Sequence, residues 1–228
     1  MIFRCSSLGR LMTEPRSKGE VLSEGAKTYI EEVFNENELG LMPKEFYSKY
    51  TDKGILMEDE AIQFASDLLE WEFVTKNATR FTEFGITGEP DILTDNLLAE
   101  IKCSFTGDTY PLYDKELKNK SYYWQVMGYM LLTGMEQAEV VYCLMDTPED
   151  IIKKEIYNEH YKLYPFWDGT ENEDLVRLVI NKHTFTKVPD KLRVKRFIVQ
   201  RDEKAIEKIK EKVEHANTYY ETLREIFN

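Results

Sequence analysis

The stretch from Gly88 to Phe105 constrains the fold of this chain more than any other. Its second half alternates with the two-residue period of a β-strand, which gives one apolar face and one largely polar face. The apolar face carries Leu97, Ala99, Ile101, Cys103 and Phe105, and the other face carries Leu98, Glu100, Lys102 and Ser104. Thr94-Asp95-Asn96 suits a tight reversal, so we expect the run from Gly88 to Leu93 to pair with this strand as a hairpin. One face is then core, and the other carries chemistry.

The hairpin brings Asp91 towards Glu100 and Lys102. Two carboxylates can hold one or two divalent cations through oxygen, and a lysine beside them can orient or deprotonate a water next to a phosphate. This trio therefore suits hydrolysis of a phosphodiester. For an isolated match of this kind the simpler interpretation is an ordinary surface pair between Glu100 and Lys102, and the rest of the chain has to decide between the two.

Length and composition indicate one domain over residues 1–228. A chain of 228 residues with 42% hydrophobic content can bury a full core. It contains no apolar run of membrane-spanning length, and its first residues lack the long apolar region of a signal peptide, so a cytoplasmic location is expected. Cys5, Cys103 and Cys143 lack the spacing of a metal site and are expected to be reduced core thiols.

The net charge of -12 argues against a protein that simply coats nucleic acid. It does not exclude a nuclease, because metal ligands are acidic and phosphate contacts need only a local basic patch. Residues 187–201 carry six basic side chains opposed only by Asp190. They are equally well explained as a strand edge that charge protects from aggregation.

A strong helix is expected from about Ile55 to Glu72, after a shorter helical stretch over Lys44–Lys53 that meets Gly54. At 100° per residue, Glu58 lies on the apolar face of this helix, whereas Glu60 points elsewhere. A carboxylate that faces the core is costly unless it binds a cation or accepts hydrogen bonds, so Glu58 is a candidate ligand. A helix-start glutamate that still reaches water remains an equal alternative.

The run from Tyr122 to Leu132 is apolar nearly all round and predicts a buried helix, in which Gln125 and Tyr129 share a face. A buried glutamine needs partners, and a metal-site carboxylate, a catalytic water, a DNA phosphate or a structural hydrogen bond would serve. The remaining pattern predicts the following elements: a helix that Ser17 or Ser23 caps and that ends near residues 35–37, a strand over 138–145, a helix from 149 to about 161, a strand over 192–200, and a last helix that Asp202 caps.

Taken together, these residues resemble a known family. Glu58, Pro90-Asp91, Glu100-Ile101-Lys102-Cys103 and Gln125-x-x-x-Tyr129 occur in the order of the PD-(D/E)XK nucleases, specifically the lambda exonuclease (YqaJ-like viral recombinase) branch. The resemblance implies an α/β fold with a restriction-endonuclease-like core, in which a central mixed β-sheet is flanked by helices.

The resemblance also implies the roles of the site residues. Asp91, Glu100 and the backbone carbonyl of Ile101 would bind Mg²⁺ or Mn²⁺, and Glu58 would hold a second ion or its waters. Lys102 would position and activate the attacking water, and Gln125 would steady the site.

The family binds the DNA phosphate through a serine-containing loop and an arginine that precedes it. Ser6 and Ser7 match that loop in part, and Arg4 or Arg10 is expected to replace the arginine, which has no counterpart at the same place. Tyr129 is a further expected DNA contact.

The resemblance implies a phage-type recombination exonuclease in the cytoplasm of a bacterial host. Such an enzyme degrades one strand of linear double-stranded DNA, 5′ to 3′, and leaves a 3′ overhang for a single-strand annealing protein. A cyclic homo-oligomer, most simply a trimeric ring, is expected. Two alternatives stay open: a related structure-specific or flap endonuclease, and a catalytically silent DNA- or protein-binding module on the same fold.

Overall fold

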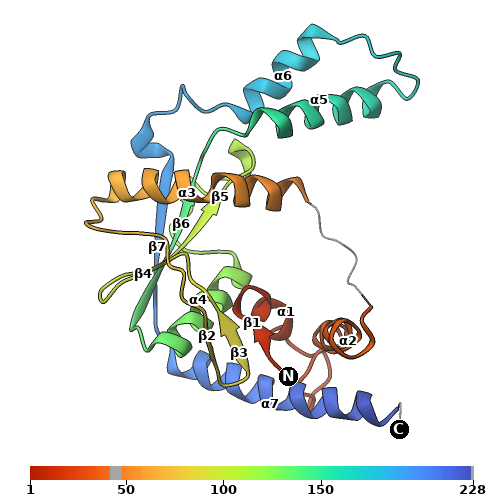
Figure 1. Ribbon diagram of the computed structural model, residues 1–228, viewed down its shortest axis with the longest axis vertical. Helices are drawn as coiled ribbons and strands as arrows, with labels where there is room; N and C mark the ends of the chain where they lie inside the picture. Colours follow the sequence, from red (N-terminus) through yellow and green to blue (C-terminus); the bar gives the residue numbers. More distant parts are fainter. Residues whose placement is uncertain (42–47, 227–228) are drawn as a thin grey trace.

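A mixed α/β architecture is seen in the computed structural model, which describes residues 1–41 and 48–226 (Figure 1). In chain order the elements are β1 (Phe3–Arg4), η1 (Cys5–Ser7), α1 (Leu8–Leu11), α2 (Glu24–Leu39), α3 (Lys49–Leu69), β2 (Phe81–Glu83), β3 (Ile86–Gly88), β4 (Ile92–Leu93), β5 (Leu98–Cys103), η2 (Gly107–Thr109), α4 (Lys120–Thr133), β6 (Gln137–Cys143), α5 (Glu149–Leu163), α6 (Glu173–His183), η3 (Asp190–Leu192), β7 (Val194–Gln200) and α7 (Glu203–Glu225). None of the described helices is long and apolar enough to cross a membrane.

The larger sheet has the strand order β4-β5-β6-β7. β5 and β6 are parallel, with Glu100 opposite Val140, whereas the β4–β5 and β6–β7 pairs are antiparallel. The predicted hairpin is confirmed: Ile92 pairs with Ala99, and the Thr94 N–H closes the reversal on the Leu97 carbonyl at 2.8 Å. A second sheet, β1-β3-β2, is built from short strands that the sequence pattern did not predict.

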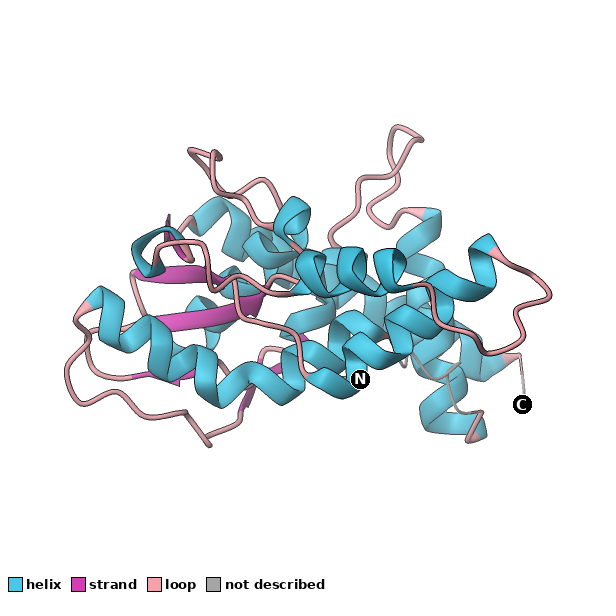
Figure 2. Cartoon of the chain, turned by 90° about the horizontal axis from the view of Figure 1, so that it is seen from above, coloured by secondary structure: helices cyan, strands magenta, loops and turns pink. Residues whose placement is uncertain are grey.

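Helices cover both faces of the larger sheet, and the strands lie among helices when the molecule is seen from above (Figure 2). On one face α4 packs, through residues such as Val126 and Met130, against Leu98 and Val140. On the other face the core is formed by Met57, Ala61, Ala65, Ala99, Ile101 and Val141, so α3 covers this face. The face expected to be core contributes Ala99 and Ile101 to this cluster. The face expected to carry chemistry is buried as well, at Leu98 and Glu100, because a central strand of a doubly covered sheet is buried on both sides.

The helix around Glu58 also differs from expectation. A single helix, α3, runs from Lys49 through Gly54 to Leu69, instead of two helices that meet at the glycine. Ser48 caps its start by accepting a hydrogen bond from the Thr51 N–H at 3.2 Å. Glycine only weakens a helix, and the cap and the tertiary contacts of α3 override that preference. Residues 44–47 of the predicted shorter helix lie outside the described residues.

The other predicted elements are present with small changes of boundary. Ser23 caps α2, and Asp202 caps α7 by accepting from the N–H groups of Lys204 and Ala205. The sequence analysis missed α6, although Asn172 marks its start by accepting from the Leu175 N–H. α5 and α6 lie side by side and project from the rest of the molecule (Figure 1).

Candidate active site

The candidate site lies on the outer edge of β5, where the strand loses its partner. β4 pairs only with Leu98 and Ala99, so the edge is open from Glu100 onward. The next N–H on this edge, that of Ile101, donates to Asp91 Oδ2 at 2.6 Å. The backbone of Asp91 is held as well, because its carbonyl accepts from the Asn77 N–H at 2.8 Å. The short hairpin thus both opens the edge and places a carboxylate on it.

Glu100 points from β5 towards α4 and is almost fully buried. Its Oε1 accepts hydrogen bonds from Lys102 Nζ at 2.6 Å and from Gln125 Nε2 at 2.7 Å. The side chains of Glu100 and Lys102 are 6% and 21% exposed, which excludes the simple surface pair. The predicted convergence of Asp91, Glu100, Lys102 and Gln125 is therefore what the structure shows.

Two donors occupy one oxygen of Glu100, and the other oxygen is left open. Oε2 is buried and makes no hydrogen bond among the described residues. A buried carboxylate oxygen without a donor is costly, and a cation is the usual partner that relieves this cost. Gln125 and Lys102 thereby orient Glu100 so that its free oxygen is available as a ligand.

The electrostatics of Asp91 and Glu100 agree with a cation site. Burial and then the nearby Glu100 charge raise the pKa of Asp91 well above that of an ordinary aspartate, because two close carboxylates resist joint ionisation. Burial works against the ammonium form of Lys102, but the attraction of Glu100 and Asp91 outweighs it and raises the pKa of Lys102. A divalent cation between the two carboxylates would remove their repulsion.

Glu58 reaches the same cavity from α3. The cavity has a volume of about 530 Å³ and is lined by Glu58, Asp91, Glu100, Lys102 and residues around them. Glu58 is 28% exposed, and its Oε1 forms an ion pair with Lys76 Nζ at 3.1 Å. The helical phase predicted from the sequence is correct, since Glu58 lines the cavity and Glu60 is exposed.

These donors suit one divalent ion directly. Asp91, Glu100 and the Ile101 carbonyl supply oxygen, which is the ligand type that Mg²⁺ prefers. In the described part of the chain, however, no three His, Cys, Asp or Glu side chains converge into a ligand cluster. Glu58 would have to leave Lys76 to join the other two carboxylates.

No family model and no curated protein matches this chain. Several solved structures do match the chain. It is similar to a phage-related exonuclease from Haemophilus somnus 129PT, with 29% identity over 100% of this chain and 97% of the other and a TM-score of 0.81. It is also similar to an alkaline exonuclease from Laribacter hongkongensis, with 18% identity over 99% and 91% of the two chains and a TM-score of 0.66. The latter protein in complex with dAMP matches with a TM-score of 0.64.

The similarity to these exonucleases supports the resemblance to the lambda exonuclease branch of the PD-(D/E)XK nucleases. The restriction-endonuclease-like fold expected from the sequence is thereby confirmed, and the similarity supports a nuclease. Within this fold, the carboxylates, the lysine and the glutamine of the nuclease motif come together, whereas the residues of the expected phosphate loop do not line the cavity.

Tyr129 of the nuclease motif is a buried scaffold residue, 4% exposed, so the expected direct contact with DNA is corrected. Its hydroxyl accepts from Gln125 Nε2 at 2.9 Å and donates to the Glu89 carbonyl at 3.4 Å. The ring packs against Gly88, where an added Cβ would come within 2.6 Å of it. Tyr129 thus holds Gln125, which in turn holds Glu100.

The residues of the expected phosphate loop do not line the cavity. Arg4, Ser6, Ser7 and Arg10 are in β1, η1 and α1, and none of the four lines the cavity. Arg10 pairs with Glu32 at 2.7 Å and stacks over the Tyr29 ring at 4.5 Å. Arg10 therefore has a structural partner, whereas Arg4 and Ser6 are exposed.

In the basic stretch 187–201, three arginines make structural contacts: Arg193, Arg196 and Arg201. Arg193 Nε donates to the Leu144 carbonyl at 2.9 Å, and Arg201 donates to the Met130 carbonyl. Arg196 lies 3.6 Å from the buried Glu139. Because β7 is an edge strand, these contacts favour the edge-protection interpretation over a phosphate patch.

Sequence reasoning missed Tyr122 and Lys53 as residues of this region. Lys102 Nζ lies 4.6 Å from the centroid of the Tyr122 ring, which lines the cavity and restricts where the ammonium can turn. Tyr122 lay inside the apolar run and looked like core. Lys53 looked like an ordinary helical lysine, and nothing in the pattern marked it as buried.

Proposed function

We propose that this protein is a Mg²⁺-dependent deoxyribonuclease that degrades one strand of linear double-stranded DNA as an exonuclease. One observation carries the proposal: Glu100 Oε1 is held by Lys102 and Gln125 while Oε2 stays open in a cavity shared with Asp91. The likeness to a phage-related exonuclease over the whole chain supports an exonuclease within the nuclease class.

Each site residue has a distinct task. A Mg²⁺ or Mn²⁺ ion held by Asp91, Glu100 and the Ile101 carbonyl would neutralise charge on the scissile phosphate and favour ionisation of a water. Lys102 stays an ammonium at neutral pH, since its pKa is raised, and it donates to the attacking water and the phosphate. Glu58, which pairs with Lys76, would supply oxygen to a second ion.

The finer features of the proposal follow the family resemblance. The strand is removed 5′ to 3′, the product carries a 3′ overhang, and a single-strand annealing protein receives it in recombination. A trimeric ring in the cytoplasm of a bacterial host would keep the enzyme on its substrate, because a net charge of -12 provides little general attraction for DNA.

The test compares linear duplexes labelled at the 5′ or the 3′ end with closed circular DNA, each with and without Mg²⁺. Early release of the 5′ label and an intact circle are expected. Nicking of the circle would favour the endonuclease alternative, and absence of cleavage in every arm would favour the silent binding module. Light scattering at micromolar concentration should report a trimer, and a monomer that degrades long DNA processively would refute the ring.

A further inference from the structure

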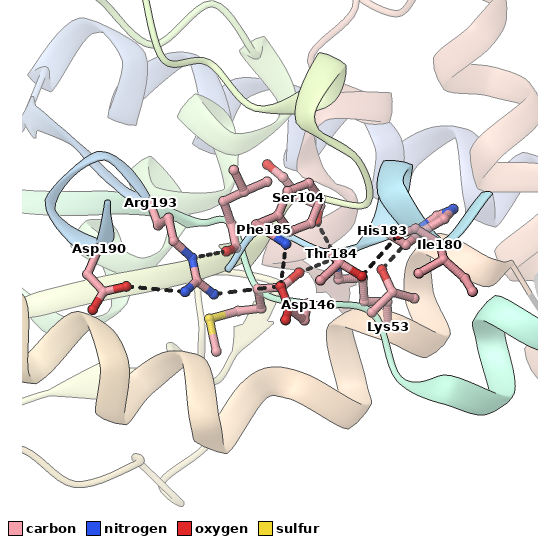
Figure 3. Close-up of polar contacts among 12 residues, drawn as sticks. Lys53, Ser104, Asp146, Ile180, His183, Thr184, Phe185, Asp190 and Arg193 are labelled. Carbon is pink, nitrogen blue, oxygen red and sulfur yellow. Dashed lines mark hydrogen bonds and ion pairs between the residues drawn. The ribbon is translucent and has the colours of Figure 1, made fainter. Parts of the chain in front are cut away.

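Among the described residues, Lys53 on α3 is the most deeply buried cation near the candidate site. Its side chain is 0% exposed. Nζ donates to the carbonyls of Ser104 at 2.8 Å, Phe105 at 3.1 Å and Met145 at 2.6 Å. Figure 3 shows Lys53 beside Ser104, in a polar network that continues to His183 and Arg193. An ammonium group has three N–H donors, so the three carbonyls satisfy it completely.

Burial disfavours the ammonium form of Lys53, while three carbonyl oxygens and two aromatic rings face it. Burial lowers the pKa of Lys53 to about 8, which is still above 7. The rings of Phe185 and Phe105 face the ammonium, with centroids 5.3 Å and 6.0 Å from Nζ. Hydrogen bonds to a charged donor are about twice as strong as neutral ones, so the three bonds form a rigid connection.

This connection joins the two parts of the candidate site. Ser104 and Phe105 directly follow β5, which carries Glu100 and Lys102, whereas Lys53 lies five residues before Glu58 on α3. Apart from two long thiol hydrogen bonds, from Cys103 to the Met57 carbonyl at 4.0 Å and from Cys143 to the Ala61 carbonyl at 3.7 Å, the contact between α3 and the sheet is apolar. A thiol is a weak donor and apolar packing is not directional. Lys53 can therefore specify how far α3 is rotated and shifted along β5, which apolar packing alone does not.

We propose that Lys53 is a positioning residue that sets the place of Glu58 relative to Asp91 and Glu100. Each residue of an α-helix advances 1.5 Å and turns 100°, so a small slip of α3 moves the Glu58 carboxylate out of the cavity. This inference rests on the proposed function, since it assigns the origin of the Glu58 position in the same hydrolytic site.

The chain contains a matched control in Lys212 of α7. Its side chain is also buried, 2% exposed, and Nζ donates to the Thr13 carbonyl at 2.5 Å. Lys212 does not line the cavity. Lys212→Met thus reproduces the loss of a buried, carbonyl-bound ammonium without touching α3.

The decisive experiment is a double-mutant cycle on cleavage of linear DNA with Lys53→Met and Glu58→Gln. If Lys53 acts through Glu58, Lys53→Met should lower kcat about 10- to 100-fold in the wild-type background, no more than Glu58→Gln does, by analogy with a 1 Å misplacement. In the Glu58→Gln background it should cost less than about 2-fold, because residues that act as a unit are not additive. Equal losses in both backgrounds would overturn the proposal.

A second readout does not depend on turnover. Calorimetric titration with Mn²⁺ should show that Lys53→Met keeps the tighter site at Asp91 and Glu100 and loses the weaker site that needs Glu58. Lys212→Met should keep both. If Lys53→Met does not fold, Lys53→Arg serves, because a planar guanidinium cannot donate to three carbonyls arranged around one nitrogen.

The two failures are distinguishable. A wild-type protein that neither cleaves DNA nor binds Mn²⁺ contradicts the proposed function. A wild-type protein that does both, beside a Lys53→Met protein with unchanged kcat and unchanged Mn²⁺ stoichiometry, contradicts only the role of Lys53.

Discussion

The two helices that complete the candidate site approach it from opposite faces of one sheet and contribute in different ways. α4 brings a buried chain of hydrogen bonds, from the Glu89 carbonyl through Tyr129 and Gln125 to Glu100. α3 brings Glu58, whose side chain is 28% exposed and is paired with Lys76, itself 47% exposed. The α4 side is buried and hydrogen-bonded apart from Glu100 Oε2, whereas the α3 side is partly exposed to solvent.

This difference separates two halves of the site. We call Glu100 with Lys102 and Gln125 the prepared half, and Glu58 with Lys76 the adjustable half. On the α4 side Gln125 and Lys102 already hold Glu100, and Tyr129 holds Gln125, so little reorganisation is needed when a cation arrives. On the α3 side the carboxylate has to exchange Lys76 for an ion, and exposed ion pairs are weak enough for such an exchange. Strong binding of one ion and weaker binding of a second is the expected result.

The largest effect is expected on the prepared half, from Lys102→Ala. Loss of the group that positions the water should reduce the rate about 100- to 10,000-fold and leave folding and most of the Mn²⁺ binding intact. Asp91→Ala should instead weaken Mn²⁺ binding in calorimetry. Lys118→Ala, an exposed lysine paired with Asp114, is the control. Full Mg²⁺-dependent activity in Lys102→Ala would contradict the assignment of Lys102 as the residue that positions the water.

On the adjustable half, Glu58→Gln should lower the rate about 10- to 100-fold, and Glu60→Gln should be nearly silent. The two residues are neighbours on one helix, but only Glu58 lines the cavity. Raising the Mg²⁺ concentration should rescue Glu58→Gln in part, because the weaker site is the one affected. The reverse ranking of the two variants, in steady-state assays, would mean that α3 is turned differently in the working enzyme.

Gln125→Leu tests whether the prepared half depends on its buried chain. Removal of the amide leaves Glu100 Oε1 with Lys102 as its remaining donor and frees the carboxylate to turn. A loss of about 10-fold in activity is expected, with a weaker apparent affinity for Mg²⁺. Gln63→Leu, which removes an exposed glutamine that bonds to Asp67, should change neither quantity. Equal behaviour of the two variants would remove Gln125 from the site.

Metal removal should expose the repulsion between the carboxylates. Burial and Glu100 raise the pKa of Asp91 to about 8, with Lys102 and Glu58 also facing it, against about 3.9 in an unfolded chain. The folded state then binds more protons, so the contribution of this group to stability is full below the unfolded value and is lost as the pH rises through about 8. Thermal unfolding in EDTA should show a midpoint that falls over this range, and Mg²⁺ should restore it. A midpoint that ignores both pH and Mg²⁺ would contradict the close carboxylate pair.

The smallest effect is expected from Gly54→Ala in α3. A Cβ at Gly54 would meet nothing within 4 Å, so alanine should stabilise the helix by about 0.5–1 kcal/mol. The unfolding midpoint should rise by a few degrees. Gly134→Ala should do the opposite, because Gly134 ends α4 with φ +76°. A Gly54→Ala protein with a lower midpoint would show that α3 needs its glycine after all.

The local sequence was enough to predict the structure wherever a pattern is compatible with a single conformation. The alternation of residues 97–105 and the reversal at Thr94-Asp95-Asn96 determined the hairpin, and with it the approach of Asp91 to Glu100. The cap at Asp202 determined the start of α7 in the same way. The side-chain phase of Glu58 was also correct, since helical geometry sets it once the helix exists.

Tertiary structure decided what the other side chains do, because burial and bonding partners come from segments distant in sequence. The burial of both faces of β5 depends on α3 and α4 together, and Lys53 finds its acceptors 51 to 92 residues away. Tyr129 had the spacing of a site residue, yet packing against Gly88 makes it a support for Gln125. A periodic pattern specifies the direction of a side chain within its own element, but only the packing of that element specifies what the side chain meets.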